Sequence, residues 1–143
     1  MKKKLTLILI GIAFLSCSCS SDDDNGNQNS CDFETIISAE QYVNAPNDQL
    51  EINSLAINDN CLKINFSSGG CDGKTWELRL IDSGDIIKSN PPQRNLRLSL
   101  KNVELCEAYI TKELTFDISR LKIDGNRVQL NITNSDEIVL YEY

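Results

Sequence analysis

Apolar and polar residues alternate along most of the chain after residue 60. A period of two places every second side chain on the same face of an extended segment, which is the pattern of a β-strand with one buried face. Five segments show this pattern, each with three apolar residues on one parity: residues 61–67, 75–81, 95–101, 113–119 and 127–133. The sequence therefore predicts five half-buried strands.

Two other segments also predict strands, but their patterns depart from simple alternation. In residues 49–57, Leu50 and Ile52 lie on one parity while Leu55 and Ile57 lie on the other. A β-bulge near residues 53–54 would return all four to one face. Residues 137–143 carry apolar side chains on both parities, which predicts a final strand covered at least partly on both sides.

Short turns and one short helix complete the expected elements. Asn, Asp and Gly gather at residues 58–60, 124–126 and 134–136, and these residue types favour the tight turns of three hairpins. The segment from Ser38 to Val43 predicts one helical turn, with Ser38 as the N-cap and Gln41 three residues later.

These elements define the expected fold class. Seven to eight short antiparallel strands with at most one short helix predict an all-β domain. We expect an immunoglobulin-like β-sandwich, with a small barrel as the alternative, because most strands have one apolar and one polar face. The strands fall within residues 31–143, which are 113 residues and sufficient for one domain with one core.

The first residues have the pattern of a secretory signal peptide, which we assign to residues 1–16. Three lysines follow Met1, and the apolar stretch from Leu5 to Leu15 is succeeded at once by small residues. A membrane-spanning helix needs about 20 apolar residues. The stretch is too short for that, so we expect it to be removed.

The end of this signal resembles the lipobox of bacterial lipoproteins. The resemblance implies that Cys17 is alkylated with diacylglycerol and becomes the N-terminus, since Phe14 supplies the apolar residue three positions upstream. Cys19 is the alternative site, because the run that starts there resembles the Ser/Asp-rich tether of surface-exposed lipoproteins from Bacteroidota-type bacteria. The resemblance thus implies a surface-exposed outer-membrane lipoprotein of the cell envelope, held to the membrane by its lipid.

Residues 17–30 form the expected tether between the lipid and the domain. Residues 20–30 contain no apolar side chain and cannot contribute to a core. Removal of the signal leaves 11 Lys and Arg against 21 Asp and Glu, a net charge of −10. Such a balance disfavours a nucleic-acid partner, whose phosphates require a basic face.

Four cysteines remain in the domain, and a secreted chain predicts two disulfides from them. A bond between Cys61 and Cys71 is disfavoured, because a strand leads away from Cys61 and few residues remain to return. Cys31 can therefore pair with Cys61 or with Cys71, leaving Cys106 to the other. The domain lacks the close thiolate pairs of a zinc site, so we expect no metal.

Several longer motifs resemble those of small, uncharacterised lipoproteins from Bacteroidota-type bacteria. The motifs are SGGCDGKTWELRLIDSG, NPPQRNLRLSL, ELCEAYITKELTFDIS and the final LYEY. In those relatives a Gly-Cys before one strand and a Cys-Glu-Ala before another recur together, which supports pairing Cys71 with Cys106. We therefore choose Cys31–Cys61 and Cys71–Cys106. The resemblance implies no activity.

The residue types present restrict the possible chemistry. The chain contains no histidine, which excludes Ser-His, Cys-His and His-metal arrangements. Glu104, Glu107, Glu113 and Asp117 lie close in sequence, and a glycosidase needs two carboxyls in one cleft. Acids on exposed strand faces are usually solvated, however.

The Gly-rich residues 67–73 lack the Lys-Ser/Thr of a phosphate loop and indicate a turn. We expect no enzyme and no cofactor.

Two features suggest contact with a ligand. Trp76 has a ring able to stack on a sugar, but it shares the parity of Leu78 and Leu80 and is expected in the core. Residues 88–95 form a Pro-containing loop in which Arg94 lies near Arg97. This basic spot is a possible binding site for a carboxylate-bearing partner, and an ordinary connection between strands is the alternative.

Three functional hypotheses follow. The first is a lipid-anchored, non-catalytic module that binds an unknown protein or glycan at the cell envelope. The second is a protease-inhibitor-like or glycan-binding domain, which would present a rigid exposed loop or an exposed aromatic patch. The third is a carboxylate-dependent hydrolase, which would bring two acids together in a deep pocket.

Overall fold

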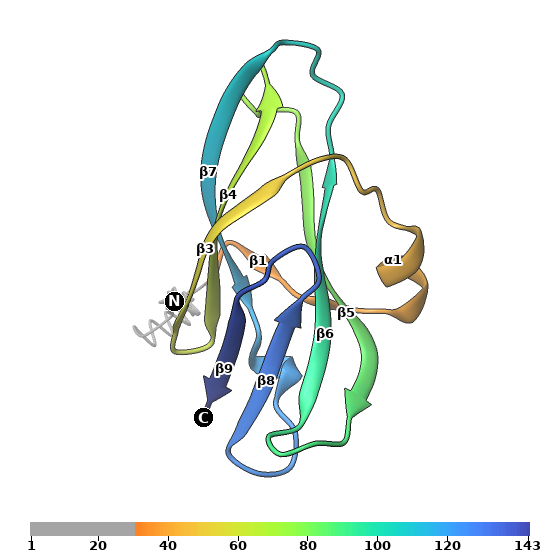
Figure 1. Cartoon of the computed structure of the whole chain (residues 1–143), viewed down its shortest axis with the longest axis vertical. Helices are drawn as coiled ribbons and strands as arrows, with labels where there is room; N and C mark the ends of the chain where they lie inside the picture. The colour runs from red at the N-terminus through yellow and green to blue at the C-terminus, as the bar shows by residue number, and fades with distance from the viewer. Residues whose placement is uncertain (1–30) are drawn as a thin grey trace, which may run out of the picture.

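The computed structural model describes residues 31–143. The predicted signal peptide, Cys17, Cys19 and the tether lie outside these residues. The described part consists of nine strands, one short α-helix and one 3-10 helix (Figure 1). In chain order the elements are β1 (Phe33–Glu34), β2 (Ile36–Ile37), α1 (Ala39–Asn44), β3 (Glu51–Asn58), β4 (Cys61–Gly70), β5 (Glu77–Ile87), β6 (Gln93–Lys101), β7 (Ala108–Asp117), η1 (Ser119–Leu121), β8 (Arg127–Ile132) and β9 (Ile138–Glu142).

The strands form two sheets that enclose one core. One sheet has the order β1-β7-β4-β3 and the other has the order β2-β5-β6-β8-β9. The predicted all-β sandwich is therefore confirmed, and the described strands do not close into a barrel. The side chains expected on the inward faces from the period of two pack between the sheets, and the fully buried ones include Leu62, Ile64, Phe66, Leu80, Leu96, Leu98, Phe116 and Leu130.

The strand count and some strand directions differ from the prediction. Two of the nine strands are only two residues long, too short for any alternation to reveal them. Three pairs are parallel: β1 with β7, β2 with β5, and β6 with β8. The hairpin predicted at residues 124–126 is wrong, because β7 and β8 belong to different sheets. Turn chemistry shows where the chain reverses but not which sheet it enters next.

The N-terminal segment crosses from one sheet to the other. β1 pairs with the end of β7 and β2 pairs with the middle of β5, so the crossing falls at Thr35, which is 1% exposed. The Thr35 N–H donates to the carbonyl of Asp117 (3.2 Å), and the Ser38 N–H donates to the carbonyl of Asp82 (3.0 Å). Both sheets are therefore joined on this side by a very short stretch of backbone.

Strands β3 and β9 correspond to the two segments in which apolar and polar residues do not alternate simply, residues 49–57 and 137–143. The register of β3 against β4 shifts between Ile52 and Ser54, which confirms the predicted bulge. In β9, Val139 and Tyr141 are buried, but Ile138 is 67% exposed and Leu140 is 43% exposed. The expected cover on the second face of β9 is therefore wrong, because Val139 and Tyr141 enter the core and the opposite parity, Ile138 and Leu140, faces outward.

The short helix α1 begins as predicted. Ser38 is its N-cap, and the Ser38 hydroxyl accepts the Gln41 N–H (3.2 Å), which satisfies one of the free donors of the first turn. No residue of α1 is fully buried. The helix lies beside β5 and β6, as Figure 1 shows, and its position depends on polar contacts described below.

Two disulfides tie the loops to the sheets. Cys31 bonds to Cys61 with a Cα–Cα distance of 5.6 Å, and Cys71 bonds to Cys106 with a distance of 4.8 Å. These are the pairs chosen from the sequence. The first fastens the N-terminal segment to the start of β4, and the second joins two loops at the opposite end of the sandwich.

Candidate functional site

Two loops meet at one end of the sandwich, the upper end in Figure 1. Residues 71–76 connect β4 to β5, and residues 102–107 connect β6 to β7. The Cys71–Cys106 disulfide holds the loops together. We call residues 71–75 together with residues 102–107 the apex.

The Glu104 carboxylate lies in a concave set of backbone donors formed by the first loop. Its Oε2 accepts the N–H of Cys71 (2.6 Å), Asp72 (3.2 Å) and Gly73 (3.0 Å). Its Oε1 accepts the Thr75 N–H (3.3 Å) and the Thr75 hydroxyl (2.9 Å). Successive N–H groups arranged in this way form an anion-binding nest. The nest of this chain is thus occupied by its own side chain.

The nest changes the acidity of Glu104. Desolvation would raise the pKa of the carboxyl, but the N–H groups of Gly73 and Cys71 and the donors of Thr75 outweigh it and lower the pKa to about 2. The carboxylate is therefore ionised across the whole physiological range. Because its charge favours the hydrogen bonds that join the two loops, the second loop is held in a defined position.

Two glycines make this arrangement possible. A Cβ at Gly70 would lie 2.6 Å from Glu104 Oε2 and 3.0 Å from Cζ2 of Trp76. Gly73 has φ +67°, in the region that side chains disfavour, and its Cβ would lie 3.0 Å from Cε3 of Trp76. The Gly-rich run is a turn, as expected, but a turn shaped to surround a carboxylate.

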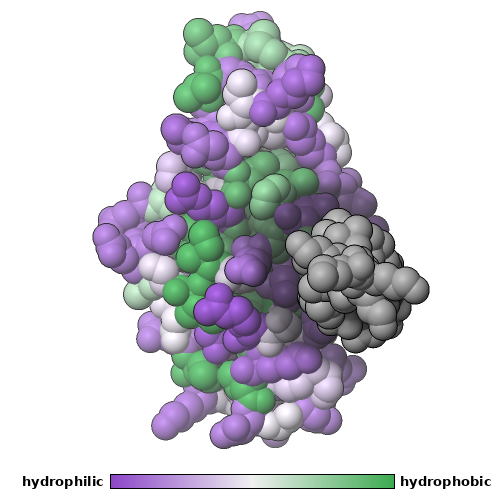
Figure 2. All heavy atoms as spheres, turned by 180° about the vertical axis from the view of Figure 1, so that it is seen from behind, coloured by the Kyte–Doolittle hydropathy of each residue, from purple (hydrophilic) through white to green (hydrophobic). Residues whose placement is uncertain are grey.

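The residues on either side of Glu104 point outward. Leu105 is 95% exposed and Val103 is 64% exposed, although both are apolar. Figure 2 shows hydrophobic residues at this end of the molecule. Because Glu104 and Cys106 are both fixed, the loop between them presents Leu105 to solvent from a constrained backbone. This is the rigid exposed loop that the second sequence hypothesis required.

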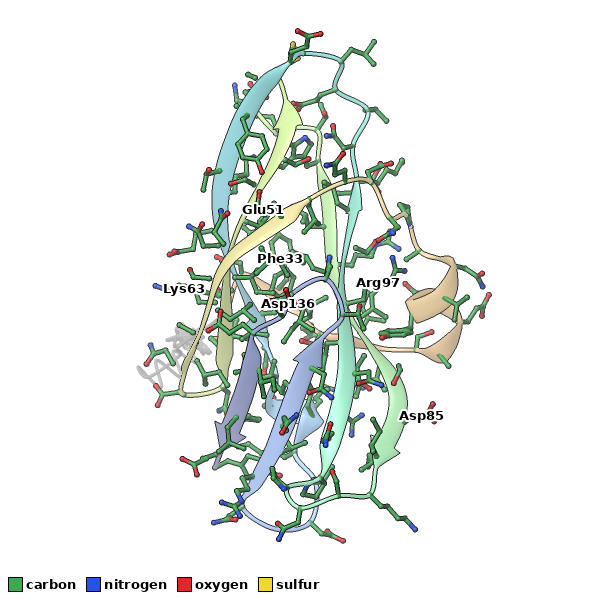
Figure 3. The ribbon with its side chains drawn as sticks, viewed as in Figure 1. Phe33, Glu51, Lys63, Asp85, Arg97 and Asp136 are labelled. Atoms are coloured by element: carbon green, nitrogen blue, oxygen red, sulfur yellow. A yellow bond between two sulfur atoms is a disulfide. The ribbon has the colours of Figure 1, made fainter. Side chains whose placement is uncertain are left out.

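A hollow of about 410 Å³ lies beside the apex. Its lining combines hydroxyl, amide and carboxylate groups with one aromatic ring: Asp48, Gln49, Leu50, Glu51, Ser67, Ser68, Gly69, Asn102 and Tyr109. Tyr109 is 64% exposed, and its hydroxyl donates to Glu51 (2.7 Å), which raises the pKa of the phenol. Glu51 is labelled in Figure 3. The hollow has the mixture of groups that a small polar ligand requires.

The basic spot predicted at Arg94 does not exist as a free surface. Arg94 is 6% exposed, and Nε and Nη2 donate to the two carboxylate oxygens of Asp82, both at 2.9 Å. Asp82 is fully buried. Arg94 shares the inward parity of Leu96 and Leu98, so β6 turns it into the core. The carboxylate that it binds comes from its own chain, and the predicted binding role is wrong.

Arg97 also has a partner within the molecule. It lies on the outer face of β6 and donates to the carbonyls of Gln41 (3.2 Å), Tyr42 (2.9 Å) and Ala45 (3.1 Å). Figure 3 shows Arg97 directed toward α1. Most of the last carbonyls of a helix have no partner within it, although the Gln41 carbonyl also accepts the Ala45 N–H (2.9 Å), and Arg97 supplies the missing donors. Its role is to hold α1 against the sheet.

The other candidate groups occupy separate places. Trp76 is 9% exposed and packs on Phe66, which confirms its expected place in the core. Glu113 pairs with Lys63 (3.5 Å), and Asp117 accepts the Ser119 N–H (2.7 Å). Within residues 31–143 no group of three potential metal-binding side chains occurs, and no helix there is long and apolar enough to cross a membrane.

Comparison with known proteins shows a similar fold in solved structures but no family to which the chain belongs. The chain matches no protein-family model and no curated protein. Among the solved structures to which it is similar, three each cover 78% of this chain. This chain spans less than two thirds of the length of each of them. They are a DUF1344 protein of unknown function from Bacteroides vulgatus (15% identity, TM-score 0.52, 56% of that chain), a NigD-like immunity protein from Bacteroides caccae (13%, 0.57, 59%) and a toxin-related protein from Parabacteroides distasonis (19%, 0.52, 59%).

The fold and the site together define a class: small, disulfide-bonded all-β domains. The fold is similar to that of the DUF1344 protein and of the NigD-like immunity protein. At these identities the likeness extends to the fold alone.

Proposed function

We propose that this chain is a lipid-anchored protein of the cell envelope that acts without catalysis, by binding a protein partner through the apex. The observation that carries the proposal is Leu105, which is 95% exposed on a loop fixed by a disulfide and by the Glu104 carboxylate. An apolar side chain on an already ordered loop loses little conformational entropy when a partner covers it. Contiguous exposed apolar surface marks interaction sites, and Val103, which is 64% exposed on the same loop, adds to the apolar surface of Leu105.

Other observations support a binding role over an enzymatic one. The chain has no histidine, and three of the four carboxylates considered for a hydrolase are engaged with different partners. One structural neighbour is described as an immunity protein and another as toxin-related, which fits a protein that acts by recognising another protein. The lipobox resemblance at Cys17 supports the lipid anchor, and the Ser/Asp-rich run that starts at Cys19 supports an outer-membrane, surface-exposed location.

Photo-crosslinking in intact cells tests the binding role. A photoreactive phenylalanine analogue replaces Leu105 in the full chain, and the matched control places it at Val43, which is 76% exposed on α1. We expect a discrete crosslinked species from position 105 that is lost when Val103 is also changed to Asp. Equal crosslinking from both positions, or none from position 105, would contradict the proposal.

Metabolic labelling tests the anchor. Cells that express the full chain with Cys17→Ala or Cys19→Ala receive an alkyne-bearing fatty acid, and incorporation into the chain is measured. We expect Cys17→Ala to abolish labelling and to release the protein from the membrane fraction. All acyl chains of the anchor are attached to this one residue, so the single substitution removes the whole anchor. Loss of labelling in Cys19→Ala alone would move the acylation site to Cys19.

The hollow beside the apex supports glycan binding as a second candidate. An exposed Tyr109 ring next to hydroxyl and amide groups is the chemistry of a sugar site. Titration of the chain with oligosaccharides of the outer envelope, followed by the chemical shifts of residues 48–51 and 109, tests it. Binding that survives Tyr109→Ala would exclude this hollow as the site.

A further inference from the structure

Two strand edges on the side of the N-terminal segment are largely unpaired. β7 pairs with β1 only at Phe116 and Asp117, and β5 pairs with β2 only at Ile81 and Asp82. Within the part of the chain described, residues 108–114 and 77–80 therefore have a strand neighbour on one side only. Such an edge presents alternate N–H and C=O groups that can pair with another strand.

A groove of about 410 Å³ lies between these two edges. Its floor is apolar: Phe33, which is 46% exposed, meets Leu78, Leu114 and the nearly buried Trp76. The N-terminal segment passes below it, because β1 covers only the last two residues of β7. Figure 2, which shows the molecule from behind, has hydrophobic residues in the middle of the face with hydrophilic residues around them.

The charge of the groove is opposite to that of the domain. Lys74, Arg79 and Lys112 line it, with Glu77 as the one acid among the lining residues. The domain as a whole has 11 Lys and Arg against 18 Asp and Glu. The Lys74 side chain is 82% exposed and pairs with Asp72 (2.6 Å), and the Arg79 side chain is 47% exposed and lies 4.0 Å from Glu77. Exposed ion pairs of this kind contribute little free energy, so acidic residues of a partner can replace Asp72 and Glu77 at these cations. With Lys112, the groove still has three cations against two acids on a domain that is acidic as a whole.

We propose that this groove binds an extended acidic segment of a partner protein, which adds to the free edge of β7 as a new strand in line with β1. The unpaired backbone supplies the strand pairing, the apolar floor receives alternate side chains, and the cations select acidic residues between them. The edge of β7 is preferred because seven of its residues are free on the side of the groove, against four of the β5 residues before its pairing with β2. The inference goes beyond the proposed role of the apex: of the residues on which it depends, only Lys74 belongs to the apex, and Leu105 does not line the groove.

A blocked peptide of about seven residues that alternates valine and glutamate is the probe, since this length matches the free edge. It is titrated into the full chain with its disulfides intact. Trp76, the single tryptophan, reports through its fluorescence, and amide chemical shifts locate the contact. We expect saturable binding with shifts at residues 108–114, and no binding of the same peptide N-methylated at alternate residues, which cannot pair as a strand.

Charge variants test the cationic rim. Lys74→Glu and Arg79→Glu should each weaken binding about tenfold at low salt, with the loss reduced at high salt. The matched control is Lys88→Glu, which has the same charge change beyond the far end of β5 and should stay within about twofold. Leu105→Asp should also leave peptide affinity unchanged, which separates this inference from the role of the apex.

Several results would overturn the proposal. Equal affinity for a valine-lysine peptide, or undiminished binding of the N-methylated peptide, would show non-specific adsorption. Shifts confined to residues 77–80 would place the strand on β5. If Asp22→Asn, Asp23→Asn and Asp24→Asn together tightened peptide binding more than about tenfold, the acidic segment of the chain itself would be the occupant and the partner would be excluded.

Discussion

Two carboxylates are held at different places in this domain by different means. Asp82 lies in the core with no exposed surface and is neutralised by the guanidinium of Arg94. Glu104 lies at the apex, where backbone N–H groups and one hydroxyl stabilise it without any cation. In the core, Asp82 and Arg94 are buried charges, and removal of either one would leave the other without compensation. At the apex, the N–H dipoles belong to the backbone of the loop and remain when the Glu104 carboxylate is removed.

The difference determines what each carboxylate does for the structure. Asp82 and Arg94 lie on β5 and β6, which are already paired with each other along their length. Their ion pair is therefore an additional polar contact within a core that these two strands help to form. Glu104 instead joins two loops that lie beyond the paired strand ends, where Gly70 faces Ala108 and Glu77 faces Lys101. We therefore expect the core pair to control global stability and the apex carboxylate to control local order.

The largest effect is expected from breaking the core pair on one side. Arg94→Met leaves the Asp82 carboxylate buried and unpaired, which should lower the free energy of unfolding by about 3 to 5 kcal/mol. The double variant Arg94→Met with Asp82→Leu should recover most of the loss, because no charge is then left in the core. Urea denaturation at neutral pH measures both. A loss below about 1 kcal/mol in the single variant would mean that Asp82 finds water or a proton instead.

Removal of the apex disulfide should have the next largest effect. The Cys71–Cys106 bond closes a loop of 35 residues, and its replacement by two alanines should cost about 3.5 kcal/mol. The matched control is the Cys31–Cys61 bond, which spans 30 residues and should cost a similar amount. Only the apex variant should lose amide protection at residues 71–75. Equal loss of protection there in the control would contradict the local role of the apex bond.

Glu104→Gln should have a smaller effect that depends on pH. The folded pKa of about 2 lies below the ordinary value of 4.5, so the ionised carboxylate stabilises the fold above about pH 4.5 and this contribution is lost as the pH falls toward 2. The variant should therefore be less stable than the parent at pH 7 and should approach it at pH 2.

Urea midpoints measured between pH 7 and pH 2 test this dependence. Glu107→Gln, which removes an exposed acid on the same loop, is the matched control and should follow the parent curve. If the Glu104 variant also kept the full acid dependence of the parent, another carboxylate would be responsible for it.

The smallest effect is expected at the surface. Glu113→Gln removes the partner of Lys63, but both side chains are about half exposed. The free energy of unfolding should change by less than about 1 kcal/mol, and the difference should vanish in high salt. A larger change would show that a surface pair can match the contribution of the core pair.

The sequence could predict the parts of the fold that follow from local pattern. The period of two identified the inward residues of five strands, and the phase shift in residues 49–57 identified the bulge of β3. The same parity rule also applied to Arg94 and Asp82, which continue the inward rows of Leu96 and Leu80. Two opposite charges on inward positions of neighbouring strands indicate a buried ion pair, and the Arg94–Asp82 pair (2.9 Å) is an example.

Other parts depend on contacts between distant residues. β1 and β2 are two residues long and carry no period, so only their pairing with β7 and β5 defines them. The role of Glu104 depends on a turn 29 to 33 residues earlier in the chain. Its proximity in sequence to Cys106, together with the Gly-Cys turn around Cys71, was the available signal. The meaning of this signal depends on the strand pairs and the disulfide that bring the two loops together.

The Cys31–Cys61 bond has a mechanical consequence. Without this bond, tension applied through the chain preceding Cys31 would act on β1 and β2. Each of these strands is paired over only two residues, so their hydrogen bonds would break one after another. The covalent bond instead transmits the force to the start of β4, a strand flanked by β3 and β7 in its sheet. The domain can therefore resist a pull from its N-terminal side with an entire sheet, and reduction of this one bond would turn a firm attachment into a weak one.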